Sequence, residues 1–413
     1  NGYYYFLEPT GTIAPGVGLI SYTGTGAHVD TSDDALDYDS NLSAFDIWSS
    51  TLIAPTAAST YSAAAAGDLR VEDASLIAAA TSGNTTAANL VAGLDHYGYI
   101  ASGDFTVDQP LTLSNGLYVR SAGSITVADA LTLPGANGLT LDAEGGALNI
   151  NAPISVTGAG RVVLDGFATI SPSMLGSIPI PGPSFAPGAS IDYGSIDHGG
   201  TLNIDGANYT LLYSMADVQA INGDGANDSI TDSALSGYYA LATSLDASGV
   251  ADWTPIGIDS NGNDLNSGDG FAGVFEGLGH TISNLTIGAN GPIDNAPVGL
   301  FGVSSGEIRD VSLTGASVQG GYLSEAGLLV GDNENLVYNA YAEGDVSLTG
   351  GEGAAGGLVG YNGAAVISSS AAGTVTVLSD GNISPEALAA GGLVGANDGI
   401  IYESHAAVDV AGP

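Results

Sequence analysis

The sequence predicts an all-β protein whose short strands stack as a parallel β-helix, a solenoid, behind a less regular N-terminal region. Three observations support this: a glycine-bounded segment recurs four times in the last third, apolar residues alternate in triplets before it, and turn-forming residues separate the triplets. Self-similarity at a fixed period is typical of architectures in which each unit buries its apolar face on its neighbours. We therefore expect an elongated stack rather than a compact domain.

Residues 1–100 form the irregular part of the prediction. Tyr-rich and Gly/Thr-rich stretches surround an acidic loop, and they indicate short strands without a readable arrangement. Between Ser62 and Leu94 the Ala and Leu content favours helix, but Gly67, Gly83 and two adjacent threonines interrupt it. We predict a β-rich N-terminal region with short helical turns.

Residues 101–170 predict the first coils of the solenoid. Pairs of apolar residues two positions apart recur with a turn signal every six to nine residues. The pairs are Leu111/Leu113, Leu117/Val119, Ile125/Val127, Leu131/Leu133, Leu139/Leu141, Leu148/Ile150, Ile154/Val156 and Val162/Leu164. Hairpins of such short strands would bury little, whereas stacked parallel coils bury every inward residue.

Residues 171–199 begin with a Pro-rich stretch, and Pro cannot donate a hydrogen bond to a sheet. We predict an extended linker or a covering strap there. Beyond it, we expect a strand pair and one helical turn around Met215–Ala220.

Residues 200–413 contain the repeats. Their closing glycines are 29, 29 and 35 residues apart, and another anchor follows each of them after thirteen residues. The closing glycines are Gly302, Gly331, Gly360 and Gly395, and the anchors are Gly315, Gly344, Gly373 and Val408. We interpret 271–291 as a degenerate first copy, in which Ile282, Leu285 and Ile287 correspond to Ile308, Val311 and Leu313.

Composition excludes several functions. The chain has 44 acidic residues against four arginines and no lysine, a formal charge of −40, so it repels nucleic acid and anionic lipid. The same charge repels itself and makes compactness depend on cations or salt. Cysteine is absent, which excludes disulfides and thiolate metal sites. No apolar run is long enough for a membrane-spanning helix, and we interpret the chain as a piece of something longer.

Several motifs after Gly200 occur in a characteristic order: Asp246-Ala-Ser, Trp253-Thr-Pro-Ile-Gly257, the string from Phe271 to Leu285, and glycine repeats at Gly299, Gly327, Gly356 and Gly391. This half of the chain resembles the filamentous-haemagglutinin-like adhesins of two-partner secretion in Gram-negative bacteria, specifically their GLUG-repeat portion. The resemblance implies a right-handed β-helix, export through an outer-membrane transporter partner, and a role in adhesion or biofilm matrix. The chain lacks the Asn-Pro secretion motif of such proteins, so the export domain would lie upstream.

Carboxylates are the first candidates for chemistry, because β-helices also carry polysaccharide-cleaving enzymes and hydrolases need two or three acids at fixed separation. Asp142, Glu144 and Asp165 could approach one another on adjacent coils. We interpret them as solvated corner acids, with a lyase or hydrolase site as the alternative. No catalytic or cofactor-binding residue is assigned.

The metal-site candidates in the sequence are two loops that could bind calcium. Oxygen ligands at alternate positions occur in 222–228, with Asp224 and Asp228, and in 259–264, with Asp259 and Asp264. Neither loop has the closing glutamate of an EF-hand, so turn chemistry is the competing and preferred explanation. The five histidines never pair at ligand spacing, and we expect His280 to make a hydrogen bond at a turn or coil edge.

Tyrosines are the candidate binding surface. They could stack on sugars or on one another along the solenoid. The residues concerned are Tyr3–Tyr5, Tyr322, Tyr338, Tyr341, Tyr361 and Tyr402.

Taken together, the sequence predicts a non-catalytic segment of a large secreted surface adhesin or extracellular fibre of a Gram-negative bacterium. It would mediate attachment or biofilm cohesion, with carbohydrate or another surface receptor as partner and possible end-to-end self-association into filaments. The alternatives are a polysaccharide lyase or hydrolase, and a calcium-dependent surface-layer or matrix protein.

Overall fold

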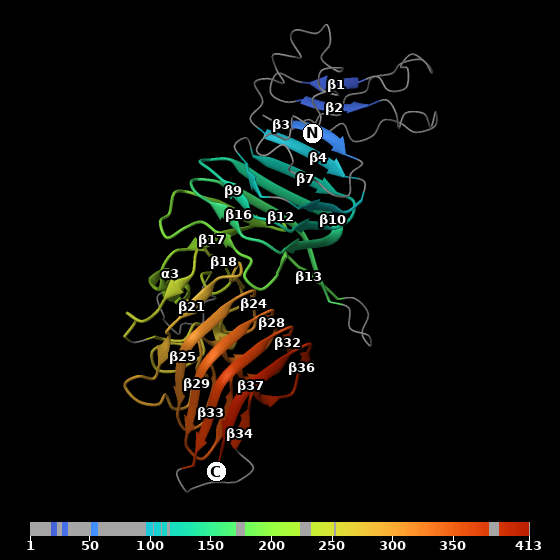
Figure 1. The fold of residues 1–413 in the computed structure, drawn as a ribbon. Helices are drawn as coiled ribbons and strands as arrows, with labels where there is room; N and C mark the ends of the chain where they lie inside the picture. The colour runs from blue at the N-terminus through green and yellow to red at the C-terminus, as the bar shows by residue number, and fades with distance from the viewer. Residues whose placement is uncertain are drawn as a thin grey trace. The chain divides into compact units, whose positions relative to one another are not determined.

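The computed structural model describes residues 18–22, 27–31, 51–56, 96–101, 103–108, 110–113, 116–170, 178–223, 233–251, 253–379 and 388–412. These residues form an all-β protein in which most strands pair in parallel, as the sequence predicts (Figure 1). The chain divides into two compact units, 1–186 with 198–206 and 187–197 with 207–413. We call them unit 1 and unit 2.

Unit 1 begins with strands in the predicted irregular region. The four strands are β1 (Gly18–Tyr22), β2 (Ala27–Thr31), β3 (Thr51–Thr56) and β4 (His96–Ala101). β1 and β2 are antiparallel, and β2, β3 and β4 then pair in parallel. The helical turns predicted between Ser62 and Leu94 lie outside the described residues.

The apolar pairs of residues 101–170 lie in or next to the strands that follow in unit 1, and all sixteen of their apolar residues are buried. The strands are β5 (Phe105–Val107), β6 (Leu111–Thr112), β7 (Leu117–Ser121), β8 (Ile125–Val127), β9 (Leu131–Leu133), β10 (Gly138–Ile150), β11 (Ile154–Val156) and β12 (Arg161–Ile170). Leu117, Leu139 and Val162 are successive partners in parallel strands, so the chain returns to the same position after 22 and then 23 residues. Short strands on several faces therefore stack, as predicted.

Three stacked sheets build this part of unit 1. β7, β10, β12 and β16 (Thr201–Ile204) form the first, which we call the A face. β5, β8, the end of β10 and β14 (Ser184–Phe185) form the B face. β6, β9 and β11 form the C face. The long strand β10 serves both the A and B faces.

The predicted linker 171–199 is divided between the two units. Residues 171–177 lie outside the described residues. β13 (Ile178–Pro181) runs antiparallel to β12, and β14 pairs in parallel with β10. Residues 187–197, with β15 (Ile191–Asp192), belong to unit 2.

After residues 187–197, unit 2 continues with β17 (Ala207–Leu212) and the predicted helical turn. Helix α3 spans Met215–Gln219, and the Ser214 hydroxyl accepts a hydrogen bond from the Asp217 amide at its N-terminus. Two 3₁₀ turns and five short strands follow. They are η3 (Ala220–Asn222), β18 (Tyr238–Leu241), β19 (Leu245–Asp246), η4 (Asn266–Gly268), β20 (Val274–Glu276), β21 (Thr281–Ser283) and β22 (Thr286–Ile287).

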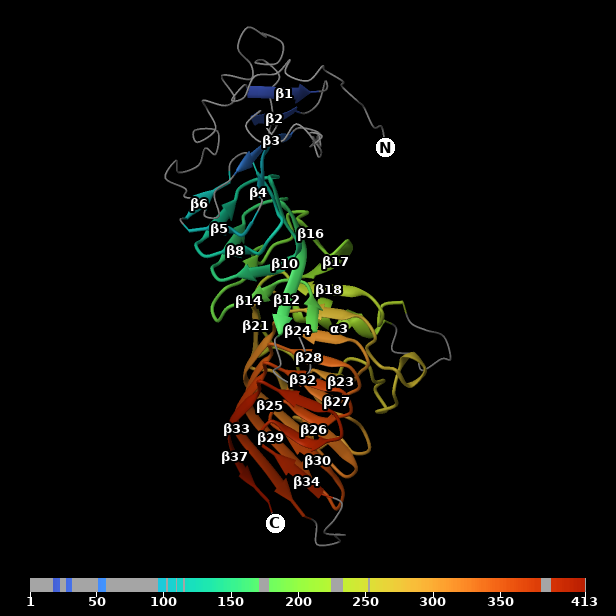
Figure 2. The same cartoon turned by 90° about the vertical axis from the view of Figure 1, so that its right-hand side faces the viewer.

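The repeats of unit 2 contribute one strand per copy to each of four parallel sheets, except that the last copy ends after three (Figures 1 and 2). The strands are β23 (Phe301–Ser304), β24 (Glu307–Arg309), β25 (Ser312–Gly320), β26 (Ser324–Gly327), β27 (Val330–Asn333), β28 (Leu336–Tyr338), β29 (Tyr341–Thr349), β30 (Gly353–Gly356), β31 (Val359–Asn362), β32 (Ala365–Ile367), β33 (Ser370–Leu378), β34 (Leu388–Gly391), β35 (Val394–Asn397), β36 (Ile400–Tyr402) and β37 (His405–Ala411). Val330, Val359 and Val394 are partners, at the predicted offsets of 29 and 35. The central prediction of parallel stacking is confirmed.

Two details of the predicted alignment are wrong. Ile282 pairs with Leu313, and the partner of Ile308 is Phe275. From Phe275 to its equivalent strand position at Ile282 the first copy advances 7 residues, whereas the next copy advances 5 from Ile308 to Leu313. The first copy therefore has two extra residues at the corner between β20 and β21. In addition, a bulge beside Gly315 places Ala316 opposite Gly344.

Close backbone contact explains the closing glycines. A Cβ added to Gly360 would lie 2.6 Å from the Ala326 nitrogen, and one on Gly395 would lie 2.6 Å from the Ala355 nitrogen. At Gly360 and Gly395 the strand thus lies against the backbone of another sheet across the coil. Only glycine leaves room for this approach.

A ladder of asparagines runs inside the repeats, and the sequence analysis did not predict it. Asn333 Nδ2 donates to Asn362 Oδ1 at 2.7 Å, and Asn362 Nδ2 donates to Asn397 Oδ1 at 2.6 Å. Asn333 and Asn362 are fully buried. Each amide therefore satisfies part of the next one's hydrogen-bonding capacity inside the core.

One corner of every repeat adopts the left-handed conformation, as expected for solenoid corners. The residues there are Asp310, Asn339, Ser368 and Glu403, with φ between 47° and 56°. Asn339 Nδ2 also donates to Asp310 Oδ1 at 2.6 Å. Asp and Asn tolerate this conformation, whereas Ser and Glu adopt it at a cost.

We expect Ser368→Asn to raise the free energy of unfolding by about 1 kcal/mol, because asparagine relieves the backbone cost and can extend the side-chain ladder from Asn339. Urea unfolding would measure the change. Ser370→Asn, in the extended strand β33, is the matched control and should give no gain. An equal effect of both substitutions would contradict the prediction.

Candidate functional site

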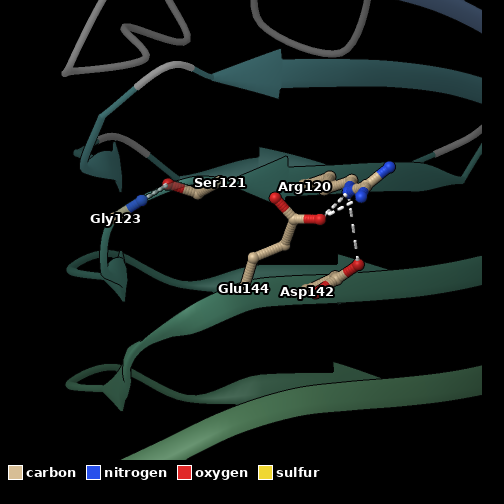
Figure 3. Close-up of polar contacts among 5 residues, drawn as sticks. All are labelled: Arg120, Ser121, Gly123, Asp142 and Glu144. Carbon is tan, nitrogen blue, oxygen red and sulfur yellow. Dashed lines mark hydrogen bonds and ion pairs between the residues drawn. The ribbon is translucent and has the colours of Figure 1, made fainter. Parts of the chain in front are cut away.

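Two of the three predicted carboxylates, Asp142 and Glu144, lie beside an arginine, and the third, Asp165, is on the neighbouring coil. Asp142 on β10 is the strand partner of Arg120 on β7 and of Asp165 on β12. Arg120 Nε lies 2.6 Å from Glu144 Oε1 and 3.8 Å from Asp142 Oδ2, and its Nη2 also contacts Glu144. Figure 3 shows both carboxylates directed at the guanidinium.

The electrostatics of this cluster follow from partial burial. Burial raises the pKa of Asp142, and the neighbouring Asp165 raises it further while Arg120 opposes the shift. The hydrogen bond to Glu144 raises the pKa of Arg120. The single positive charge of Arg120 pairs closely with Glu144 and lies farther from Asp142, so Asp142 and Asp165 remain strand partners without a cation of their own among the described residues.

The calcium candidates have two different outcomes. Asp224 and Asp228 lie outside the described residues. Asp259 Oδ1 accepts the backbone amides of Asn261 and Asn263 at 2.7 and 2.9 Å. Burial alone would raise the pKa of Asp259, but hydrogen bonds from the two asparagines outweigh it and lower that pKa. Within the part of the chain that the structure describes, no group of three or more acidic or histidine side chains is arranged to hold a metal. The residues of the loop 259–264 therefore act as turn formers.

His280 makes the predicted hydrogen bond. Its Nε2 lies 2.9 Å from the carbonyl oxygen of Ile191, and its Nδ1 lies 3.4 Å from the Ser244 hydroxyl. A carbonyl only accepts, so we assign the ring proton to Nε2. Burial lowers the pKa of His280, which keeps the ring neutral at pH 7. The ring thus fastens the segment around Ile191 to the first coils of unit 2.

The tyrosines do not form one ladder. Tyr341, Tyr361 and Tyr402 belong to three different sheets through β29, β31 and β36. Tyr338 is buried, and Tyr322 is 42% exposed. Tyr3–Tyr5 lie outside the described residues. Phenylalanine rings pack closely in the core of unit 2, with Phe301 centred 5.2 Å from both Phe271 and Phe275.

A second acidic cluster was not predicted. Asp332 on β27 has its Oδ1 buried without a hydrogen bond among the described residues. Burial and then the nearby Glu334, Glu325 and Asp264, in that order of effect, together raise the pKa of Asp332 to about 7. The four acids come from three segments of unit 2, since Asp332 and Glu334 are only two residues apart. Their repulsion favours a protonated Asp332.

This shift predicts a pH-dependent stability. The folded pKa of Asp332, about 7, exceeds its ordinary value of 3.8. The folded state therefore binds the Asp332 proton more tightly than the unfolded state does. The stability that this proton provides is fully present below about pH 4 and is lost as the pH rises through 7. We expect Asp332→Asn to melt higher than the wild type at pH 8, with a smaller difference at pH 5.

Melting temperatures at both pH values would test this expectation. Asp409→Asn removes the same charge from an exposed position on β37 and is the control. Its effect should be the same at the two pH values. If Asp332→Asn behaves like the control, the assignment of the raised pKa is wrong.

A buried ion pair is the strongest feature that the sequence analysis missed. Glu276 on β20 is fully buried and Arg309 on β24 is 3% exposed. They are strand partners, with Arg309 Nε 2.9 Å from Glu276 Oε2. Arg309 Nη2 also donates to the Tyr209 hydroxyl at 3.0 Å. Burial raises the pKa of Glu276, and Arg309 opposes this by favouring the carboxylate.

Comparison with known proteins gives one partial similarity. Over 152 residues, 36% of this chain, the sequence is 34% identical to halomucin from Haloquadratum walsbyi. The matched segment is 2% of halomucin, so this chain corresponds to a small part of a very long protein. No family model matches the chain, and no solved structure matches it. Among the described residues, no helix is long and apolar enough to cross a membrane.

Proposed function

We propose that this chain is a non-catalytic segment of a large extracellular, surface-associated protein. The observation that carries the proposal is the partial similarity to halomucin, a protein whose name denotes a mucin. The stacked strands support it, because in-register parallel ladders give a stiff scaffold that suits a long structural protein. The charge of −40 is consistent with a surface that stays soluble and resists non-specific association.

The finer proposal is that the units are right-handed parallel β-helices of an adhesin that binds carbohydrate. The four stacked sheets of the repeats support the β-helix, and the uncharged polar faces of the coils suit a sugar ligand. Export through an outer-membrane partner of a Gram-negative bacterium rests on the sequence resemblance alone. End-to-end association is part of the same proposal and rests on the sequence interpretation alone.

Antibodies against unit 2 would test the surface location. They should label intact cells of the source organism, and protease added to intact cells should remove the signal while a cytosolic marker survives. Labelling that requires permeabilised cells would overturn the proposal.

A polysaccharide hydrolase is the second candidate, favoured by the facing carboxylates of Asp142 and Asp165. One raised pKa beside a second acid is the arrangement that acid–base hydrolysis requires. The test is release of reducing ends from a polysaccharide panel by the purified chain. Turnover that Asp142→Asn abolishes would establish this alternative.

A further inference from the structure

Two columns of uncharged polar side chains run along unit 1 on the B and C faces. On β5, β8, β10 and β14 of the B face and on β6, β9 and β11 of the C face, one outward residue lies between two inward apolar residues, and it carries a hydroxyl or an amide. On the B face the column is Thr106, Thr126, Asn149 and Ser184. On the C face it is Thr112, Thr132 and Ser155. Figure 2 shows β5, β8, β10 and β14 as neighbouring strands of the B face.

The columns are rigid and regularly spaced. Strand partners place the side chains in register, about 4.8 Å apart along the stack. The residues that flank the columns are packed in the core: Ile125 and Val127 beside Thr126 are fully buried, as is Leu133 beside Thr132. Threonine has few χ1 rotamers, so its hydroxyl loses little entropy when a ligand binds.

The hydroxyls also keep most of their hydrogen-bonding capacity. Among the described residues, the side-chain hydrogen bond within the two columns is the weak one from Asn149 Nδ2 to Thr126 Oγ1, at 3.4 Å. All seven side chains are at least partly exposed. A ligand can therefore bond to them without first breaking strong internal contacts.

Charge selects the ligand class. The columns carry no charge, although the chain has a formal charge of −40. The acids Asp104, Asp108 and Asp129 lie at the ends of these strands and at the corner between the two faces. Such a rim repels anionic chains, while the hydroxyl array matches a ligand that is itself uncharged and rich in hydroxyls.

We propose that the B and C faces of unit 1 bind a neutral, extended polysaccharide lying along the stack, with its hydroxyl groups bonded to successive side chains of the columns. This inference rests on the proposed carbohydrate-binding function and gives it a site and a ligand class. Because the contacts are uncharged, binding should persist at high salt.

Retention of the purified chain on insoluble polysaccharides tests the proposal. Cellulose, chitin and mannan are the neutral probes, and alginate is the anionic one. We expect retention on at least one neutral probe, unchanged by high salt, and none on alginate. A variant with Thr106, Thr112, Thr126 and Thr132 all changed to Val should bind at least about tenfold more weakly.

Thr140→Val is the matched control, since Thr140 is the outward residue of an equivalent triplet on the A face. It should bind like the wild type, and all variants should keep the wild-type melting temperature. No retention on any neutral probe, or equal retention of the fourfold variant, would overturn the inference. Surface labelling of intact cells would be unaffected by that failure, so the two proposals are tested separately.

Discussion

Replacing Arg309 by methionine should lower the free energy of unfolding of unit 2 by about 3–5 kcal/mol. The substitution leaves the fully buried carboxylate of Glu276 without its cation, and a charge stranded in the core is among the largest single destabilisations known. It also removes the donor to the Tyr209 hydroxyl. Denaturant unfolding at pH 8 would give the largest effect, because protonating the unpaired Glu276 to remove its buried charge costs more free energy as the pH rises.

The double variant Glu276→Leu with Arg309→Met separates pairing from packing. Both charges are then gone, and the apolar side chains fill similar volumes, so most of the lost stability should return. Arg161→Met, at an exposed position of unit 1, is the control for removing an arginine and should change little. A single variant as stable as the double one would show that the pair contributes nothing.

The same pair has a second expected role, in setting the register of the coils. The inward positions Ile308, Val337, Val366 and Ile401 are similar enough that a slip by one repeat would keep the core apolar. Such a slip would place Glu276 against Tyr338, which cannot neutralise it. We therefore hypothesise that the stable double variant populates mixed registers, visible as broadened amide resonances or as oligomers. A double variant with wild-type spectra would refute this role.

Much of the fold could be predicted because the pattern that determines it is local. Burial in a strand alternates with period two, so pairs such as Leu139 and Leu141 mark their own strand and its inward face. The repeats then fix the pairing, since Val330 and Val359 must occupy equivalent positions. No knowledge of distant contacts was needed for either step.

The buried ion pair was missed because it depends on which coils become neighbours. Glu276 and Arg309 are 33 residues apart, and the two extra residues at the corner before Ile282 hid their equivalence. The asparagine ladder, by contrast, was readable. Asn333, Asn362 and Asn397 each follow a closing glycine by two residues, and Ser304 holds that place in the first copy. The loop 259–264 also shows why a calcium site is hard to predict from sequence, because the residue types that bind calcium also form turns, as Asp259 does.

Substituting alanine for Gly360 should cost about 2–4 kcal/mol and strain two sheets at once. The new Cβ would lie 2.6 Å from the Ala326 nitrogen, 2.6 Å from the Glu325 carbonyl carbon and 2.7 Å from the Gly331 oxygen. All three are backbone atoms of neighbouring strands, so no side-chain rotation can relieve the contact. The coil must widen, and widening separates the strands that carry the buried asparagines.

Gly249→Ala provides the matched control for this substitution. An added Cβ at Gly249 meets nothing within 4 Å, so the effect there should be within about 0.5 kcal/mol or slightly stabilising. Urea unfolding of both variants measures the difference, and hydrogen exchange at Asn333 and Asn362 reports whether the ladder opens. If Gly360→Ala unfolds like Gly249→Ala, the close approach of the two backbones cannot be what requires glycine at the end of each repeat core.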